Sequence, residues 1–95
     1  MNRTVLVTGA SKGIGRAIAR RLARDGFHIV VHYGADRAGA EATLSEITAA
    51  GGAGRIIGFD IADRSSCAAV IGSDIESNAP YYGVVLNAGL SLIHI

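Results

Sequence analysis

Three glycines and a serine form the segment of the sequence best suited to chemistry, Thr8-Gly-Ala-Ser-Lys-Gly-Ile-Gly15. It follows a short β-branched run and precedes an amphipathic one, so we expect it to join a strand to a helix. At such a junction glycines permit a tight turn and let backbone N–H groups approach a phosphate. The helix N-terminus adds unpaired donors and a partial positive charge. The segment is therefore predicted to bind the diphosphate of a dinucleotide through residues that share this turn: Gly9, Ser11, Lys12, Gly13, Ile14 and Gly15.

The glycine spacing, G-x-x-x-G-x-G, separates this turn from two other nucleotide-binding motifs. The general dinucleotide fingerprint G-x-G-x-x-G fails, because the third position counted from Gly13 is occupied by Ile18. The P-loop also fails, because no lysine followed by serine or threonine comes after the closing glycine. A glycine-rich connector without a ligand is the remaining alternative, and three glycines with Ser11 at a strand-to-helix junction favour the phosphate site.

The rest of the chain alternates between short apolar runs and helical periodicities. Strands are predicted at residues 4–8, 28–32, 55–59 and 83–87. Helices are predicted at residues 13–24, 37–50 and 64–77, with Gly26 closing the first and Asp63 capping the third. The resulting order, βαβαβαβ, predicts an α/β fold with right-handed crossovers and a parallel sheet covered by helices on both faces.

Helical periodicity also predicts which side chains face the core. In the first helix the expected inward stripe contains Ile14, Ile18 and Leu22. An arginine row at the same spacing is expected to form a solvated face, with a binding patch as the alternative: Arg16, Arg20 and Arg24. Of these, only Arg16, in the first turn of the helix, is expected to lie close to the phosphate site. Cys67 lies on the apolar stripe of the third helix and is expected to be a small buried side chain.

The composition limits the class of protein and its partners. With 95 residues, 49% of them hydrophobic, the chain suits one globular domain. A formal net charge of +1 gives no electrostatic basis for binding nucleic acid or an anionic membrane, and no apolar run approaches the roughly 20 residues of a membrane span. Cys67 is the only cysteine and the start lacks the apolar core of a signal peptide, so a cytoplasmic location is expected.

His28 and His32 have no further ligand at metal-binding spacing, which predicts structural or surface roles and no metal site.

Three motifs together resemble the cofactor-binding region of the short-chain dehydrogenase/reductase family. The glycine turn resembles the family's cofactor motif, Asn87-Ala88-Gly89 resembles its second signature, and Asp60 ends the third predicted strand, where the family has an aspartate. The resemblance runs from about residue 3 to residue 89 and is closest, within the family, to the 3-oxoacyl-[acyl-carrier-protein] reductases. It implies that residues 1–89 are the N-terminal part of a dinucleotide-binding domain, the first half only of a Rossmann-type doubly wound parallel sheet.

The resemblance also implies roles for residues outside the glycine turn. The Asp60 carboxylate would accept a hydrogen bond from the adenine amino group, with the Ile61 backbone alongside, and a simple strand-end cap is the alternative. The segment Asn87-Ala88-Gly89 would lie beside the cofactor ribose and steady the sheet. An ordinary turn is the alternative for Asn87.

The tip of the second strand decides between NADP and NAD in this architecture. An acidic residue there would bind the 2′-hydroxyl of NAD and repel the 2′-phosphate of NADP. The sequence has Tyr33 instead, and its only lysine, Lys12, stands in the glycine turn, where similar NADP-binding members carry a basic residue. Lysine meets a phosphate as a point charge, so NADP(H) is the predicted cofactor, although Asp36 and Arg37 follow shortly afterwards.

Members of the family transfer hydride to or from a carbonyl carbon, while a Tyr-x-x-x-Lys pair and a serine assist at the substrate oxygen. The 95 residues contain no Tyr-x-x-x-Lys pair, and the family's catalytic residues follow the Asn-Ala-Gly segment. No catalytic residue is therefore assigned, and the chain alone is expected to be inactive. The resemblance implies a parent enzyme that reduces a 3-oxoacyl-[acyl-carrier-protein] thioester or a similar carbonyl. A sugar, steroid or other alcohol as substrate, and a non-catalytic nucleotide-binding module, stay open as alternatives.

The end of the sequence departs from the family pattern. Residues 90–95, Leu-Ser-Leu-Ile-His-Ile, are mostly apolar and match one reading frame of a common transposon-end sequencing adapter, so this tail is expected to be non-native. The chain is then expected to be a fragment whose fourth strand has an unpaired apolar edge, which predicts poor solubility and marginal stability. The resemblance implies a homotetrameric or homodimeric parent.

Overall fold

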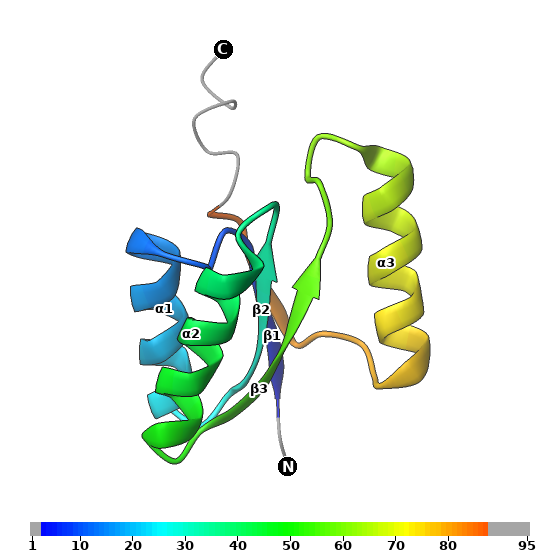
Figure 1. The fold of residues 1–95 in the computed structure, drawn as a ribbon. Helices are drawn as coiled ribbons and strands as arrows, with labels where there is room; N and C mark the ends of the chain where they lie inside the picture. Colours follow the sequence, from blue (N-terminus) through cyan, green and yellow to red (C-terminus); the bar gives the residue numbers. More distant parts are fainter. Residues whose placement is uncertain (1–2, 88–95) are drawn as a thin grey trace.

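A computed structural model of the chain describes residues 3–87, in which four strands alternate with three helices (Figure 1). The strands are β1 (Thr4–Val7), β2 (His28–Tyr33), β3 (Ala53–Gly58) and β4 (Gly83–Val85). The helices are α1 (Gly13–Arg24), α2 (Arg37–Ala49) and α3 (Arg64–Ser77). The predicted order βαβαβαβ is confirmed, while the tail expected to be non-native, residues 90–95, lies outside the described residues.

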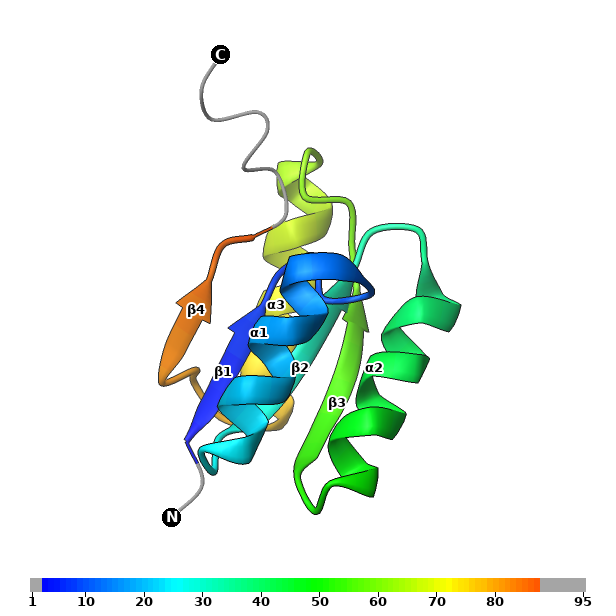
Figure 2. The ribbon, with the colours of Figure 1, turned by 90° about the vertical axis from the view of Figure 1, so that its left-hand side faces the viewer.

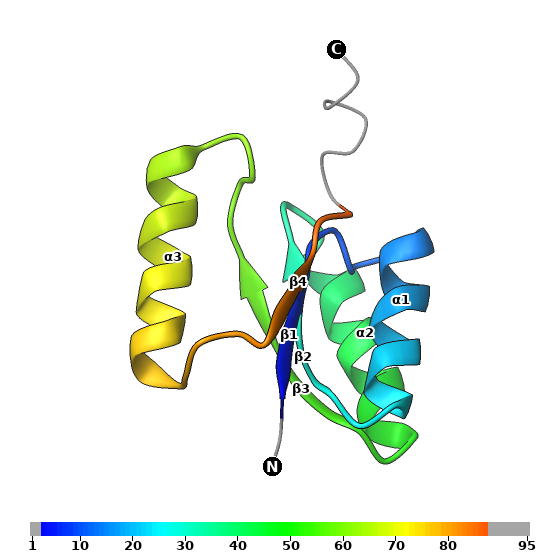
Figure 3. The same cartoon turned by 180° about the vertical axis from the view of Figure 1, so that it is seen from behind.

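The four strands lie parallel in one sheet of order β3-β2-β1-β4. Helices α1 and α2 cover one face and α3 lies over the other, as Figures 1 and 3 show from opposite sides. The chain moves outward from β1 to β2 to β3 and then returns to place β4 on the other side of β1. The predicted parallel sheet with helices on both faces is confirmed, and the strand order reverses between β1 and β4.

Burial on both faces explains why β1 and β2 read as unbroken apolar runs, since successive side chains point to opposite sides of a sheet. Side chains of one parity face α1 and α2 in the larger apolar cluster, which includes Val5, Val7, Ile29 and Val31. Side chains of the other parity form a smaller cluster on the face of α3: Leu6, Val30, Ile57 and Phe59. Neither β1 nor β2 has a solvated face.

Helix α1 packs on the sheet through small buried residues: Gly15, Ala19 and Ala23. Ile18 and Leu22 are half-buried against the larger cluster, as expected. Ile14 is 72% exposed, so its predicted inward position is wrong. The contact stripe begins one residue later because Gly15 lets the helix approach the turn closely, and this rotation leaves Ile14 in solvent.

Two strand boundaries differ from the prediction by two residues because backbone pairing sets them, and the other strand boundaries agree within one residue. β3 begins at Ala53, two residues earlier than expected, since Ala53 pairs with His28 of β2. Small residues at this position give little side-chain signal for a strand. β4 ends at Val85 because the Asn87 N–H donates to the hydroxyl of Thr8 at 2.8 Å and leaves the backbone ladder.

Helix α3 contacts the sheet through half-buried apolar side chains and through a polar cluster. None of its residues is fully buried, and Cys67, predicted to be buried, is half-buried against the smaller cluster. Arg55 of β3 donates to the two carboxylate oxygens of Asp74 at 3.0 and 2.7 Å, and the Tyr81 hydroxyl donates to the same carboxylate at 2.6 Å. This cluster of Arg55, Asp74 and Tyr81 links α3, β3 and the segment that enters β4.

β4 is the last strand of the sheet within residues 3–87 and pairs there with β1 (Figure 2). Apolar side chains stand out from it and its flanks: Tyr82 is 62%, Val84 50% and Leu86 61% exposed. The apolar strand edge that the sequence predicts is therefore present. In this part of the chain no helix combines the length and apolarity needed to cross a membrane.

Candidate functional site

The predicted site residues gather at the edge of the sheet where the strands end, because all the strands run in the same direction (Figures 1 and 2). The glycine turn follows β1, Tyr33 ends β2, Asp60 follows β3 and Asn87 follows β4. In an open parallel sheet, ligands bind at this edge beside the reversal of strand order. Ala88 and Gly89, predicted to lie alongside, fall outside the described residues.

The three glycines of the turn meet two requirements, a left-handed backbone and the absence of a side chain. Gly9 and Gly13 have φ angles of 62° and 61°, in the left-handed region that favours glycine. Gly15 has no room for a side chain, because a Cβ there would overlap the carbonyl oxygen of Gly9 and lie 2.8 Å from the Asn87 Nδ2 atom. The turn thus combines the tight geometry that the sequence predicts with close packing of α1 against it.

Asn87 fastens the end of β4 to the glycine turn. Its N–H donates to the Thr8 hydroxyl at 2.8 Å, and its side-chain amide donates to the Gly9 carbonyl at 3.3 Å. The Thr8 hydroxyl in turn donates to the Val85 carbonyl at 3.2 Å. The steadying role expected for Asn87 is therefore visible in these bonds, while its contact with a ribose stays a prediction.

His32 is buried between the glycine turn and the end of β3, with 1% of its surface exposed. The Gly9 N–H donates to its Nδ1 atom at 2.9 Å, and its Nε2 atom lies 2.9 Å from the Phe59 carbonyl oxygen. Because Nδ1 accepts, the ring is neutral and Nε2 donates to Phe59. Burial lowers the pKa of His32 below its usual range and outweighs the opposing effect of the bond to Phe59. The predicted structural role of His32 is thus to join two segments of the site.

The stability of the chain is expected to fall as the pH drops below about 6.5, the usual pKa of histidine. The unfolded chain then takes up a proton that folded His32 resists, so the free energy of unfolding falls until the pH reaches the lowered pKa. Each such group contributes at most about 1.4 kcal/mol per pH unit. His28, whose pKa is lowered by burial and by Arg55, adds an effect of the same sign. The measurement is the unfolding midpoint of the wild type and His32→Asn between about pH 7.5 and 5.5.

His32→Asn removes one titrating ring and is expected to show a shallower pH dependence than the wild type. The remaining slope reports His28 and the other titrating groups. Equal slopes in the two proteins would contradict the buried neutral state of His32.

The N-terminus of α1 lacks the side-chain cap that the two other described helices have. Asp36 caps α2 by accepting from the Gly39 N–H at 2.9 Å, and Asp63 caps α3, as predicted, by accepting from the Ser66 N–H at 3.1 Å. Helix α1 follows Lys12, whose side chain makes no capping bond, and it has no acidic residue in its first turn. Its first N–H groups and the positive end of its dipole therefore suit a phosphate.

The other predicted residues lie along the same edge and make protein contacts of their own. Asp60 is exposed, and one of its carboxylate oxygens accepts from the Ala62 N–H at 2.9 Å. The Ile61 side chain packs against the smaller apolar cluster. The Tyr33 hydroxyl accepts a hydrogen bond from Arg37 at 3.4 Å. These contacts leave the Asp60 side chain at the surface, as a role in binding adenine requires.

Other features of the described residues do not compete with this edge as a phosphate site. A cavity of about 560 Å³ lies away from the glycine turn, between the C-terminal ends of α1 and α2. Helix C-termini present carbonyl oxygens and a partial negative charge, which disfavour a phosphate. Arg20, which lines this cavity, pairs with Glu46 at 3.3 Å. Residues 3–87 also contain no group of three His, Cys, Asp or Glu side chains placed to hold a metal ion.

Sequence reasoning missed Thr43 beside the turn, and it placed Arg16 near the phosphate site without its hydrogen bonds. The predicted solvated row is wrong at Arg16, whose side chain is 28% exposed and donates to the Ser11 carbonyl at 2.6 Å and the Thr43 hydroxyl at 2.9 Å. Arg20 and Arg24 are exposed, as predicted. Helical spacing alone does not predict the bonds of Arg16, because most of its acceptors come from α2, 23 to 30 residues away in sequence.

Comparison with known proteins identifies the family. The short chain dehydrogenase family model matches residues 3–94. The chain is 47% identical over 91 residues to the 3-oxoacyl-[acyl-carrier-protein] reductase FabG of Aggregatibacter actinomycetemcomitans. It is 42% identical over 97 residues to the L-rhamnose 1-dehydrogenase (NAD(P)(+)) of Azotobacter vinelandii. These alignments cover 96% and 99% of this chain but 38% of each relative.

A solved structure agrees with this assignment. The promiscuous reductase LugOII, which catalyses keto-reduction at C1 during lugdunomycin biosynthesis, matches with a TM-score of 0.78 and 32% identity over 90% of this chain and 36% of its own. The described sheet and helices are consistent with the first half of a Rossmann fold, and the chain spans less than two fifths of these relatives. The chain belongs to the short-chain dehydrogenase family, whose members are oxidoreductases that use a nicotinamide cofactor.

Proposed function

We propose that this chain forms the NADP(H)-binding half of a short-chain oxidoreductase and holds the cofactor diphosphate in its glycine turn. The observation that carries the proposal is the uncapped N-terminus of α1 behind that turn. Gly9 and Gly13 adopt left-handed φ angles there, and Gly15 admits no side chain. A backbone shaped in this way offers N–H donors to a phosphate and excludes competing side chains.

The rest of the strand-end edge would hold the nucleoside parts of the cofactor. We assign Asp60 and the Ile61 backbone to the adenine, because the Asp60 side chain is exposed at the tip of β3. We assign Asn87, Ala88 and Gly89 to the ribose side, because Asn87 is bonded directly to the glycine turn. We also assign Ser11 and Ile14, which belong to the turn, to the diphosphate site.

The choice of NADP over NAD rests on charge at the tip of β2. Tyr33 stands where an acid would bind the 2′-hydroxyl of NAD. The nearby acid, Asp36, accepts from the Gly39 N–H and caps α2. Lys12 is exposed in the turn and offers the 2′-phosphate a positive charge.

When bound, the nicotinamide ring supplies or accepts the hydride of the reaction. The residues of this chain would bind and orient the cofactor, while the groups that activate the substrate belong to the rest of the parent enzyme. The sequence contains no Tyr-x-x-x-Lys pair, so the 95-residue chain alone is proposed to be inactive. We propose a cytoplasmic parent that acts as a homotetramer or homodimer.

The proposed substrate is a 3-oxoacyl-[acyl-carrier-protein] thioester or a similar carbonyl, by similarity to the FabG relatives. The likeness to an L-rhamnose 1-dehydrogenase favours a sugar as the second candidate. A coding sequence that continues past residue 89 into a Tyr-x-x-x-Lys pair would support the enzyme. A genuine stop codon, with good solubility and tight NADPH binding, would support a non-catalytic nucleotide-binding module.

Thermal unfolding of the chain with NADPH and with NADH tests the cofactor assignment. At a free NADPH concentration of about 100 times Kd, the folded state is expected to gain about 2.7 kcal/mol. Lys12→Gln removes the point charge and is expected to reduce the preference for NADPH over NADH by about tenfold. Equal stabilisation by the two cofactors in the wild type would contradict the NADP preference. No stabilisation by either would contradict dinucleotide binding.

A further inference from the structure

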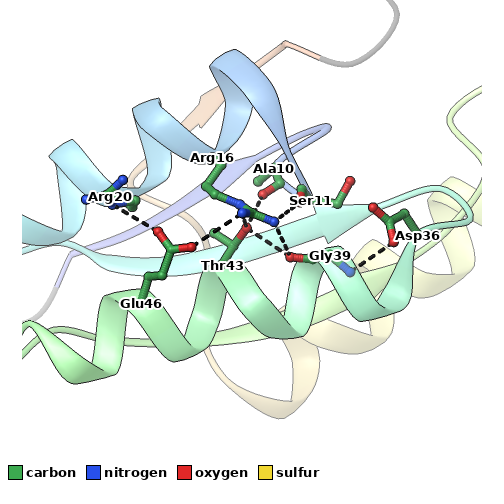
Figure 4. Close-up of polar contacts among 8 residues, drawn as sticks. All are labelled: Ala10, Ser11, Arg16, Arg20, Asp36, Gly39, Thr43 and Glu46. Carbon is green, nitrogen blue, oxygen red and sulfur yellow. Dashed lines mark hydrogen bonds and ion pairs between the residues drawn. The ribbon is translucent and has the colours of Figure 1, made fainter.

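Arg16 is the most extensively bonded side chain near the glycine turn (Figure 4). Its guanidinium donates to the Ser11 carbonyl at 2.6 Å and to the Gly39 carbonyl at 3.2 Å. It also donates to the Thr43 hydroxyl at 2.9 Å and to the Glu46 carboxylate at 3.3 Å. Four of its five N–H donors are thereby used, and the shortest bond goes to the turn.

Thr43 extends this contact to a second carbonyl of the turn. Its hydroxyl is fully buried, accepts from Arg16 and donates to the Ala10 carbonyl at 2.7 Å. The Ala10 and Ser11 carbonyls, which are consecutive in the turn, are thus both fixed by side chains on the α1–α2 side of the site (Figure 4).

Fixing these carbonyls also fixes the N–H groups that follow them. In a planar trans peptide the C=O and the N–H point in opposite directions. The Ala10 carbonyl therefore sets the direction of the Ser11 N–H, and the Ser11 carbonyl sets that of the Lys12 N–H. Within residues 3–87, neither N–H donates to a protein acceptor. Two adjacent donors are held away from α2 with no partner of their own.

We propose that Arg16 and Thr43 are positioning residues that aim the Lys12 and Ser11 N–H groups at the cofactor diphosphate. This inference rests on the proposed function and adds two residues that would not touch the cofactor. Through Gly39 the same guanidinium ties the turn to the start of α2, beside the tip of β2. The guanidinium therefore fixes the position of the glycine turn, proposed to bind the diphosphate, relative to the tip of β2, proposed to lie near the 2′-phosphate.

Arg20 provides the matched control, because it shares one partner with Arg16 and lacks the others. It lies one helical turn further along α1, pairs with the same Glu46 at 3.3 Å and is mostly exposed. It has no hydrogen bond to the glycine turn. An arginine that served only to tie α1 to α2 would resemble Arg20 in its effects.

The experiment measures the NADPH Kd by fluorescence titration and the unfolding midpoint for four variants of the chain. Arg16→Met and Thr43→Val are expected to weaken NADPH binding about tenfold, because the backbone donors lose their fixed direction. Thr43→Ser keeps the hydroxyl, so its NADPH Kd is expected to stay within about twofold of the wild-type value. The NADPH Kd of Arg20→Met is expected to stay within the same range, because an exposed ion pair contributes little. A second readout needs no ligand: in ¹⁵N–¹H spectra the Lys12 amide signal is expected to move in Arg16→Met and to stay in place in Arg20→Met.

The outcomes separate this inference from the proposed function. Wild-type affinity in Arg16→Met or in Thr43→Val would overturn the positioning role, as would an equal loss in Arg20→Met. If Arg16→Met does not fold, the comparison of Thr43→Val with Thr43→Ser decides. If the wild-type chain binds no NADPH, the proposed function fails, and an unmoved Lys12 amide in Arg16→Met would overturn the positioning role separately.

Discussion

Replacing Gly15 with alanine is expected to weaken NADPH binding at least about 100-fold, the effect of losing two charge-assisted hydrogen bonds. The new Cβ would overlap the Gly9 carbonyl oxygen and lie 2.8 Å from Asn87 Nδ2, and both are held in place by the turn and β4. Helix α1 must then move away from β1, which is expected to cost about 3 kcal/mol or more of folding free energy. The measurements are the NADPH Kd and the unfolding midpoint.

The control is a second glycine-to-alanine change inside a helix. A Cβ at Gly72 of α3 would meet nothing within 4 Å, so Gly72→Ala is expected to stabilise the chain by about 0.5–1 kcal/mol and to leave NADPH binding unchanged. The comparison removes the general effect of helix propensity. Wild-type affinity in Gly15→Ala would show that the close approach of α1 to the turn is not required for binding.

Replacing Asp74 with alanine is expected to destabilise the chain by about 2–3 kcal/mol, because Arg55 and Tyr81 lose their shared partner. The Arg55 guanidinium holds the pKa of Asp74 below its usual range, so the carboxylate is charged at neutral pH. Burial and the bond to Asp74 raise the pKa of Tyr81. Helix α3 has no fully buried residue to compensate. The unfolding midpoint is expected to fall by roughly 4–8 °C per kcal/mol.

Asp25→Ala is the matched ion-pair control. Asp25 pairs with Arg21 at 3.4 Å on the surface of α1, and both side chains are about half exposed or more. Such a pair contributes about 0.5 kcal/mol or less. If Asp74→Ala proved as mild as Asp25→Ala, the apolar contacts of α3 would have to hold that helix without the Arg55, Asp74 and Tyr81 cluster.

The features that the sequence predicted well are those determined by local chemistry. Glycine at positions 9, 13 and 15 marks the turn because two of these positions need a left-handed φ and the third needs an absent side chain. The cap at Asp63 and the alternation of strands and helices are also local signals, and the structure has both. Asp60 and Asn87 could be placed at the same edge because parallel strands end together.

The features that the sequence could not predict depend on contacts between distant elements. Ile14 follows the helical period of Ile18 and Leu22, yet the close approach at Gly15 shifts the buried stripe away from it. Arg16 could be placed near the turn from its position in the first turn of the helix, but its bonds could not be predicted, because α2 supplies most of its acceptors. His32 resembles an ordinary strand residue, because both of its partners are backbone groups, which leave no signature in the sequence.

Titration of the ¹⁵N-labelled chain with NADPH, followed by ¹⁵N–¹H spectra, tests most directly whether the glycine turn binds the cofactor. We predict saturable shifts of the amide signals of residues 11–15, with smaller shifts near Asp60 and none at Arg20 or Gly51 in the cavity between the ends of α1 and α2. Shifts confined to that cavity, or an unchanged turn in a chain that binds NADPH, would contradict the assignment of the diphosphate to the glycine turn.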